Sequence, residues 1–382
     1  MDDRTPEADR DEGSLAPPEE GIAPESASVQ FRCDGCGAVM AWCPDADALL
    51  CDYCGARRAV AAAGTAIREY ALDEAGDAAR GLGREMRATR CRTCGASVAF
   101  DTAAVSASCV FCGSPEVLEQ AASRNAIRPE SLVPLDVGRA AVEEAYRRWL
   151  AGLWFRPSAL KRLRTFQATG VYVPHWTFDC DVRSVWTAQA GYYYYVTETY
   201  VTTQNGKPVV RTRQVRKVRW VPAAGERQDV FDDLLVLGSQ GIDESLAAKL
   251  GAFDTAALVP YRPEYLAGWA AEEYQVPLAD AWTLGAARVE RIQERRCSGD
   301  VPGDTQRFLR VRNRISDVRW KHVLLPVWSL SFTWKGKVYP VLVHGQTGKV
   351  VGRAPWSVAK FAALALVLLA VIAAAGVLIA LS

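Results

Sequence analysis

Two small cysteine-rich β units, an aromatic-rich α+β body and one C-terminal transmembrane helix form the fold that this sequence of 382 residues predicts. Three observations support this prediction. A set of cysteine pairs occurs twice near the N-terminus, ten of the twelve tryptophans lie between Trp149 and Trp334, and the chain ends in the apolar run Phe361 to Leu381. The length is sufficient for two or three domains.

The first 30 residues contain nine acidic and two basic side chains and almost no large apolar ones. Such a segment buries too little apolar surface to offset its ordering entropy, so we expect residues 1–30 to be a disordered acidic arm. They also show no secretory signal peptide, so we interpret the eleven cysteines as reduced thiols. The whole chain has 45 basic and 44 acidic residues, which argues against a protein that coats polyanions.

The cysteine pairs form an internal repeat. Each copy has two Cys-x2-Cys pairs separated by fourteen residues, a glycine follows every pair, and the second copy lies at an offset of 58. The eight cysteines are Cys33, Cys36, Cys51, Cys54, Cys91, Cys94, Cys109 and Cys112. Two identical copies indicate duplication of one supersecondary unit.

Tetrahedral metal chemistry explains this spacing. Two Cys-x2-Cys turns brought together by a hairpin supply four thiolates, which close a structural Zn²⁺ site. We therefore predict two tandem zinc ribbons, at residues 31–58 and 90–118, with a linker at 59–89 and two Zn²⁺ per chain. Disulfides and a rubredoxin-like iron site are the alternatives. Cys43, Cys180 and Cys297 are expected to be spare or buried thiols.

The body is expected at residues 131–355, and its elements follow from local patterns. The expected elements are a short helix within Tyr70 to Arg80 in the linker, a turn at Gly81 to Gly83, an amphipathic helix from Asp136 to Leu153 with Asp136 as its N-cap, strands from Val171 to Val221 with a hairpin at Asn205-Gly206, a mostly helical stretch from Leu246 to Arg296, and strands from Arg307 to Gly352. We expect most tryptophans to be core residues.

The C-terminal run has no charged side chain between Phe361 and Leu381. At 1.5 Å per residue, such a run spans roughly 31 Å, which matches a bilayer core. We therefore predict a transmembrane tail anchor at residues 358–381. Lys349, Arg353 and Lys360 precede the apolar run Phe361 to Leu381, and basic residues favour the cytoplasmic side. This predicts a single-pass protein of the inner membrane with a cytoplasmic N-terminal region.

Signals for catalysis are weak. His175, His322 and His344 belong to no known catalytic motif, and the turn from Gly345 to Lys349 lacks the residues of a phosphate-binding loop. We therefore expect no enzyme activity, no catalytic residues and no small-molecule substrate.

A basic strand lies between Val209 and Trp220, with Arg211, Arg213, Lys217 and Arg219 at alternating positions and hence on one face. The simplest interpretation is a solvated face. The alternative is contact with phosphates of nucleic acid or of anionic lipid, of which lipid is favoured because the anchor is nearby.

Several short motifs follow one another between about Phe31 and Lys360. Besides the paired ribbons they are Gly81-Leu82-Gly83-Arg84-Glu85, Ile127-Arg128-Pro129, Trp149-Leu150, Trp154-Phe155, Gly170 to Trp176, Leu325-Pro326-Val327-Trp328 and Gly345 to Val350. This set resembles a family of bacterial membrane-anchored proteins with two TFIIB-type zinc ribbons, sometimes labelled primosomal replication factor or superfamily II helicase-like. The resemblance implies zinc on the eight cysteines, a C-terminal anchor and no established enzyme activity. It also points to partnership with SPFH or phage-shock proteins in envelope stress.

These observations favour a membrane-anchored zinc-ribbon adaptor that binds partner proteins at the cytosolic face of the membrane. The alternative is a zinc-ribbon nucleic-acid-binding protein tethered to the membrane. The charge of the ribbons argues against that alternative, because acidic residues outnumber basic ones in the first ribbon.

Overall fold

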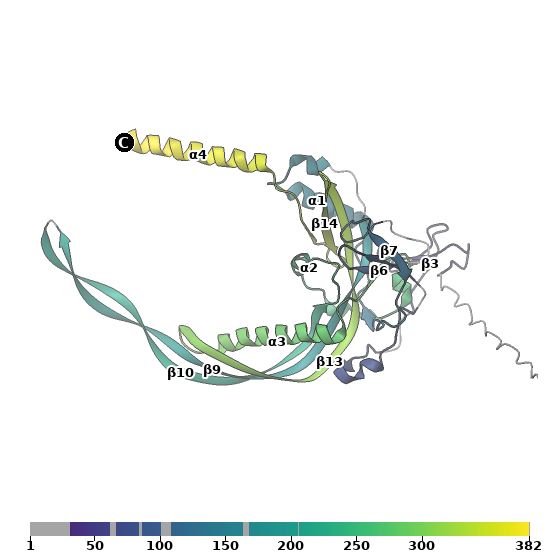
Figure 1. The fold of residues 1–382 in the computed structure, drawn as a ribbon, viewed down its shortest axis with the longest axis horizontal. Helices are drawn as coiled ribbons and strands as arrows, with labels where there is room; N and C mark the ends of the chain where they lie inside the picture. The colour runs from purple at the N-terminus through teal and green to yellow at the C-terminus, as the bar shows by residue number, and fades with distance from the viewer. Residues whose placement is uncertain are drawn as a thin grey trace, which may run out of the picture.

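The computed structural model describes residues 31–61, 66–83, 86–100, 108–162, 168–204 and 206–381. The predicted acidic arm at residues 1–30 lies outside the described residues. Within the described part, the body is mostly β-sheet, so the prediction of an α+β body was only partly correct. The chain forms one principal sheet, a separate three-stranded sheet near the N-terminus, and four α-helices in the described ranges (Figure 1).

Three long antiparallel strands dominate the principal sheet. β9 (Ala168–Gln204) pairs with β13 (Thr305–Trp334) on one edge and with β10 (Lys207–Leu237) on the other. From Cys180 to Ala190, buried and exposed side chains alternate strictly for most of the stretch, as expected for a strand with one covered face. The helix α3 (Leu278–Asp300) covers this face, where Ala281, Val289 and Cys297 are buried.

Short elements complete the described part. The strands are β1 (Ala41–Cys43), β2 (Ala48–Leu50), β3 (Arg57–Arg58), β4 (Tyr70–Ala71), β5 (Arg87–Cys91), β6 (Ser97–Phe100), β7 (Val117–Ala121), β8 (Ser131–Leu132), β11 (Val259–Pro260), β12 (Ala270–Glu273), β14 (Lys337–His344) and β15 (Val350–Gly352). The helices are α1 (Arg139–Gly152), α2 (Glu244–Leu250), α3 and α4 (Val358–Leu381), with 3₁₀ turns at Pro44–Ala46, Leu72–Gly76, Ser158–Arg162, Thr255–Ala257 and Pro263–Leu266.

Beyond Gly191 the sheet narrows from three strands to two. The pairing of β9 with β13 ends where Thr305 lies opposite Gly191, so the rest of β9 pairs with β10 alone. The side chain of Asp304 closes this junction by accepting a hydrogen bond of 2.7 Å from the N–H of Tyr193. Residues 192–219 therefore form a two-stranded projection, which we call the hairpin extension (Figure 1). At about 3.3 Å per residue, its 13 residues per strand from 192 to 204 span about 43 Å.

The predicted hairpin is confirmed by the register. Gln204 pairs with Lys207, and Gly206 adopts a φ of 74°, which only glycine takes without strain. Asn205 lies outside the described residues. The four predicted basic residues of β10 lie on one face of the extension, and Arg216 lies on the other.

Three helix predictions were wrong in detail. Residues 70–80 form the strand β4 and a 3₁₀ turn instead of an α-helix. The helix α1 begins at Arg139 with Gly138 as its N-cap, because the N–H of Asp136 instead bonds the carbonyl of Gly345. The stretch from Leu246 to Arg296 is α-helical only in α2 and α3, and between them lie two short 3₁₀ turns and β12, a strand of the principal sheet.

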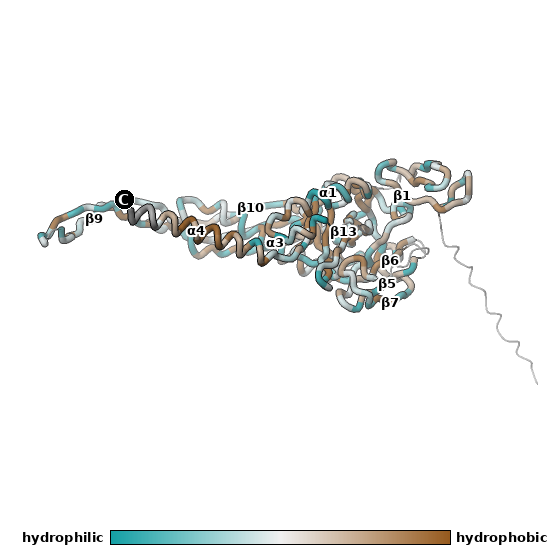
Figure 2. Tube along the Cα trace, turned by 90° about the horizontal axis from the view of Figure 1, so that it is seen from above, coloured by the Kyte–Doolittle hydropathy of each residue, from teal (hydrophilic) through white to brown (hydrophobic). Residues whose placement is uncertain are grey.

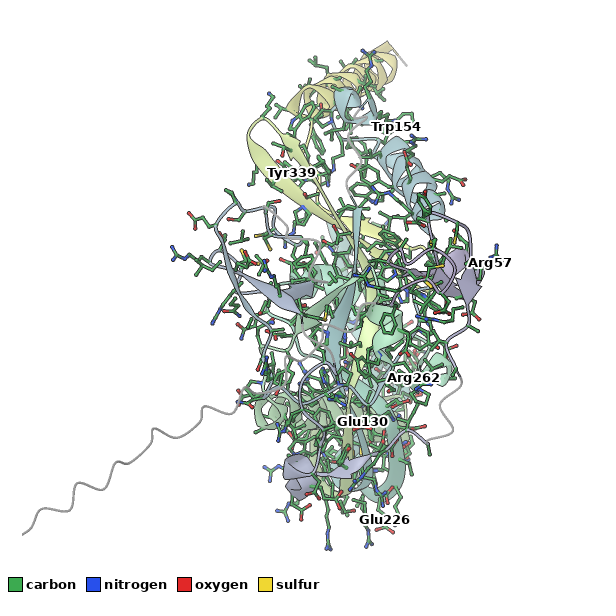
Figure 3. The ribbon with its side chains drawn as sticks, turned by 90° about the vertical axis from the view of Figure 1, so that its right-hand side faces the viewer. Arg57, Glu130, Trp154, Glu226, Arg262 and Tyr339 are labelled. Carbon is green, nitrogen blue, oxygen red and sulfur yellow. The ribbon has the colours of Figure 1, made fainter. Side chains whose placement is uncertain are left out.

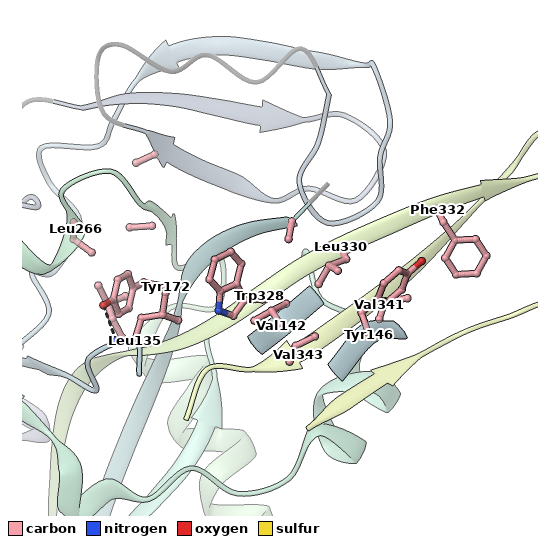
Figure 4. Packing of buried hydrophobic residues seen from close by; sticks show 14 of the residues in the cluster. Leu135, Val142, Tyr146, Tyr172, Leu266, Trp328, Leu330, Phe332, Val341 and Val343 are labelled. Atoms are coloured by element: carbon pink, nitrogen blue, oxygen red, sulfur yellow. Dashed lines mark hydrogen bonds between the residues drawn. The ribbon is translucent and has the colours of Figure 1, made fainter. Parts of the chain in front are cut away.

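The main core lies where α1 packs against β13, β14 and β15. Val142 and Tyr146 of α1 contact a layer that includes Trp328, Val341 and Val343, as Figure 4 shows. The prediction that tryptophans form the core is confirmed for a buried group. Its members are Trp42, Trp176, Trp186, Trp320 and Trp328. Trp154 and Trp356 are instead exposed.

The C-terminal helix α4 leaves this core and has few contacts with it (Figure 1). Within the described residues, one helix is long and apolar enough to cross a membrane, with its candidate span at Val358–Gly376 and a mean hydropathy of 2.5. None of that span is buried inside the protein, and Figure 2 shows its hydrophobic character. The predicted membrane helix is thus present as an exposed apolar helix.

Candidate metal centres

Four backbone knuckles with the same hydrogen bonds hold the eight predicted cysteines. In each knuckle the N–H of the glycine after the second cysteine bonds the carbonyl of the first cysteine, at 2.8 to 3.1 Å. These glycines have φ values between 71° and 81°, so any side chain there would strain the turn. The four are Gly37, Gly55, Gly95 and Gly113. The local sequence therefore positions both thiols of every pair.

The knuckles meet in two clusters of four sulfurs, as predicted. In the first, the Sγ atoms of Cys33 and Cys54 lie 3.4 Å apart, and Cys36 lies 3.5 Å from both Cys51 and Cys54. In the second, the Sγ atoms of Cys91 and Cys112 lie 3.6 Å apart, and so do those of Cys94 and Cys109. A tetrahedron with Zn–S bonds of about 2.3 Å has edges of about 3.8 Å. All four ligand atoms of each cluster lie within 4.8 Å of one another, so both can hold a metal ion.

Backbone N–H groups favour the thiolate form of some of these cysteines, and those of Gly35 and Cys36 lower the pKa of Cys33. The N–H groups of Cys54 and Tyr53 lower the pKa of Cys51 to about 7. The Cys94 thiol and the N–H groups of Cys112 and Phe111 lower the pKa of Cys109 to about 5. Because a metal cation further favours thiolates, these clusters suit a soft or borderline divalent ion.

The two clusters sit in different structural settings. The first lies in the separate sheet of β1, β2 and β3, which packs on the body through a small apolar cluster that joins Trp42 and Cys51 to Ala267. There, the backbone N–H of Trp42 donates to the carbonyl of Ala267, and the indole N–H of Trp269 donates to the carbonyl of Trp42, both at 2.9 Å. Figure 3 shows Arg57 of this unit at one side of the molecule.

The second cluster belongs to the principal sheet. Its strands β5, β6 and β7 extend that sheet because Ser97 to Ala99 of β6 pairs with Ala271 to Glu273 of β12, which itself pairs with β9. Cys91 and Cys109 are buried in a core shared with Val171 and Leu246. The second cluster and the body therefore share one core and one sheet.

The other cysteines and the histidines lie outside both clusters. Cys43 is half-buried, and Cys180 and Cys297 are buried. Three histidines each place a ring nitrogen 2.9 to 3.2 Å from a backbone carbonyl, so each ring donates a hydrogen bond to the backbone. They are His175, His322 and His344. Burial lowers the pKa of His175 and His322 to about 4.

Sequence reasoning missed one group of carboxylates, formed by Asp179, Asp232 and Asp233. Its charge is partly offset, because the buried ammonium of Lys321 lies 2.7 Å from both Asp233 and Glu69. Burial would lower the pKa of Lys321, but these pairs raise it above the usual value. We interpret the group as an internal ion-pair network. The Asp232-Asp233 dipeptide was its one sequence signal.

Comparison with known proteins adds a distant relative. The uncharacterized protein YdjG of Bacillus subtilis (strain 168) is 24% identical over 331 residues, which cover 72% of this chain and 92% of that protein. No family model matches the chain, and no solved structure matches it. The chain is thus similar along most of its length to an uncharacterized bacterial protein.

Proposed function

We propose that this chain is a membrane-anchored zinc-ribbon adaptor, which binds partner proteins at the cytosolic face of the inner membrane. The observation that carries the proposal is the hairpin extension. Residues 192–219 pair only with each other, and the side chains of Tyr195, Val201 and Val210 are each about two-thirds exposed. Isolated two-stranded hairpins are marginally stable in water, and an exposed apolar surface of this kind is typical of a binding element.

The anchor supports a role at the membrane. α4 would confine the ribbons and the extension near the bilayer, which raises their effective concentration for a membrane-bound partner. Lys349 and Arg353 precede α4, Lys360 lies in its first turn, and these basic residues favour a cytoplasmic body. Thiolates also stay reduced in that compartment. The family resemblance adds SPFH or phage-shock proteins as partners to test.

Zinc would complete both ribbons. We expect two Zn²⁺ per chain in protein purified under reducing conditions, and a colourless solution, since iron in the same sites would absorb visible light. Cys91→Ser should lower the ratio by about one, because three thiolates rarely hold a closed site. Cys43→Ser is the matched control and should leave it at two. Metal analysis that finds almost no zinc, with the thiols oxidised, would contradict the assignment.

Removing the hairpin extension should abolish partner binding while leaving the fold intact. Tyr192 and Arg219 are cross-strand partners, so replacing residues 193–218 by Asn-Gly closes the hairpin at its base. We expect two zinc ions, an unfolding temperature within about 3 °C of the parent, and at least tenfold less captured partner, since only exposed pairing is lost.

Photo-crosslinking locates the contact directly. A crosslinking residue at Tyr195 in the extension or at Tyr53 in the first ribbon should capture membrane proteins in cells, whereas one at Leu284 on α3 should not; all three positions are exposed. Equal capture from all three positions, or unchanged capture after deletion of the extension, would count against an adaptor that docks through these surfaces.

One observation favours the alternative of nucleic-acid binding. Residues 192–219 carry six basic and one acidic side chain, a net charge of +5, and β-ribbons with such charge can enter a nucleic-acid groove. Arg213 and Arg219 also stack on Tyr200 and Tyr192. Binding of the anchor-deleted chain to DNA and RNA over a salt series tests this. A steep salt dependence that disappears when Arg211, Arg213, Lys217 and Arg219 become alanine would favour the alternative.

A further inference from the structure

A cavity of about 520 Å³ lies where the anchor helix meets the body. Its walls come from two segments about 200 residues apart in sequence. The body contributes Trp154, Phe155 and Lys161, and α4 contributes Lys360, Leu364 and Val367 among others. This is the size of a cavity that holds part of a lipid or a drug-sized molecule.

The cavity has an apolar wall and a basic end. Leu364 and Val367 belong to the candidate membrane span, so this wall faces hydrocarbon when α4 crosses a bilayer. At the other end, the ammonium of Lys360 donates one hydrogen bond of 2.8 Å to the carbonyl of Trp154 and keeps further donors. Among the described residues, no carboxylate forms an ion pair with Lys161 or Lys360.

Aromatic side chains around the cavity mark the headgroup level of the bilayer. Trp154 and Trp356 are 76% and 62% exposed, although most tryptophans of this chain are covered. Phe155 stacks on Phe361 at 5.3 Å, and Arg156 lies 3.4 Å above the ring of Trp356. Figure 3 shows Trp154 at the end of the molecule from which α4 departs. Such belts of tryptophan and basic residues form at membrane interfaces.

We propose that this cavity binds one anionic phospholipid from the surrounding bilayer. Its phosphate lies between Lys161 and Lys360, and an acyl chain follows Leu364 and Val367 along α4. Two cations without a carboxylate favour a headgroup with net negative charge over a zwitterionic one. The proposal rests on α4 spanning a membrane, and it holds whether or not the chain is an adaptor.

Native mass spectrometry of the full chain in mild detergent tests the site. The first molecule of phosphatidylglycerol should bind more tightly than phosphatidylcholine with the same acyl chains. A lysine near a phosphate contributes about fivefold to such binding, so Lys161→Ala with Lys360→Ala should weaken it about 30-fold. Lys335→Ala with Lys337→Ala, at the tip of the hairpin of β13 and β14, removes equal charge outside the cavity and should change the affinity less than twofold.

A second variant separates shape from charge. Leu364→Trp fills the cavity without altering charge and should also weaken the first binding event, while alkaline extraction should still leave the variant in the membrane. Equal affinity for the two lipids, or equal effects of the two lysine pairs, would overturn the proposal. Competition by millimolar glycerol phosphate would assign the basic end to a free anion and would also overturn it.

Discussion

Cys109→Ser should lower the unfolding temperature of the whole β body, whereas Cys51→Ser should leave that main transition nearly unchanged. The two cysteines occupy the same position of the repeat, at an offset of 58, and both are buried. They differ only in setting. Cys109 lies between β6 and β7, and β6 pairs with β12 inside the principal sheet, whereas Cys51 directly follows β2 of the separate sheet of β1 to β3.

The size of the difference follows from metal-coupled folding. A structural zinc stabilises its site by about 10 kcal/mol or more, and losing one ligand removes a large part of this. If about 4 kcal/mol of that reaches the body, the main transition falls by about 8 to 16 °C. Without such coupling, Cys51→Ser should shift it by less than about 3 °C. Calorimetry of both variants, with metal analysis showing one zinc lost from each, makes the comparison, and equal shifts would refute the coupling.

The metal centres were predictable because their determinants are local. A Cys-x2-Cys-Gly sequence specifies its own knuckle, and the equal spacing in both copies brings the two knuckles of each copy together. The hairpin of β9 and β10 was predictable for the same reason, since Gly206 sits between two strand-like runs. The exposed apolar helix α4 was predictable from the length and composition of its segment alone.

What the sequence could not show is how distant segments pair. The stretch Ala270-Ala-Glu-Glu273 has the composition of a helix, yet it forms β12 at the centre of the sheet. Tertiary contacts override propensity there, because Glu272 is buried and accepts a hydrogen bond of 2.8 Å from Ser239. The partner of β12 in the second ribbon lies more than 170 residues earlier. No local pattern indicates that this ribbon belongs to the body's sheet.

Deleting residues 356–382 should convert an integral membrane protein into a soluble one with an intact fold. The candidate span Val358–Gly376 has a mean hydropathy of 2.5 and none of it is buried. Its apolar surface is therefore exposed in water, which is unfavourable, and is covered by lipid in a bilayer. Removing it costs the body little, because α4 meets the body near its first turns, where Lys360 and Phe361 contact Trp154 and Phe155.

The full chain should therefore stay in the membrane fraction after high salt and alkaline washing, while the truncated chain should appear in the supernatant with two zinc ions still bound. Leu368→Arg with Val371→Arg provides a control that keeps the length of α4. Each arginine at the centre of a membrane helix costs about 2.5 to 3.5 kcal/mol on insertion scales, so this variant should also be released in large part. If the truncated chain still sediments after alkaline washing, another part of the molecule holds it in the bilayer and α4 is not the anchor. Release of the truncated chain together with loss of its zinc would instead mean that α4 supports the fold, which its exposed position in the structure argues against.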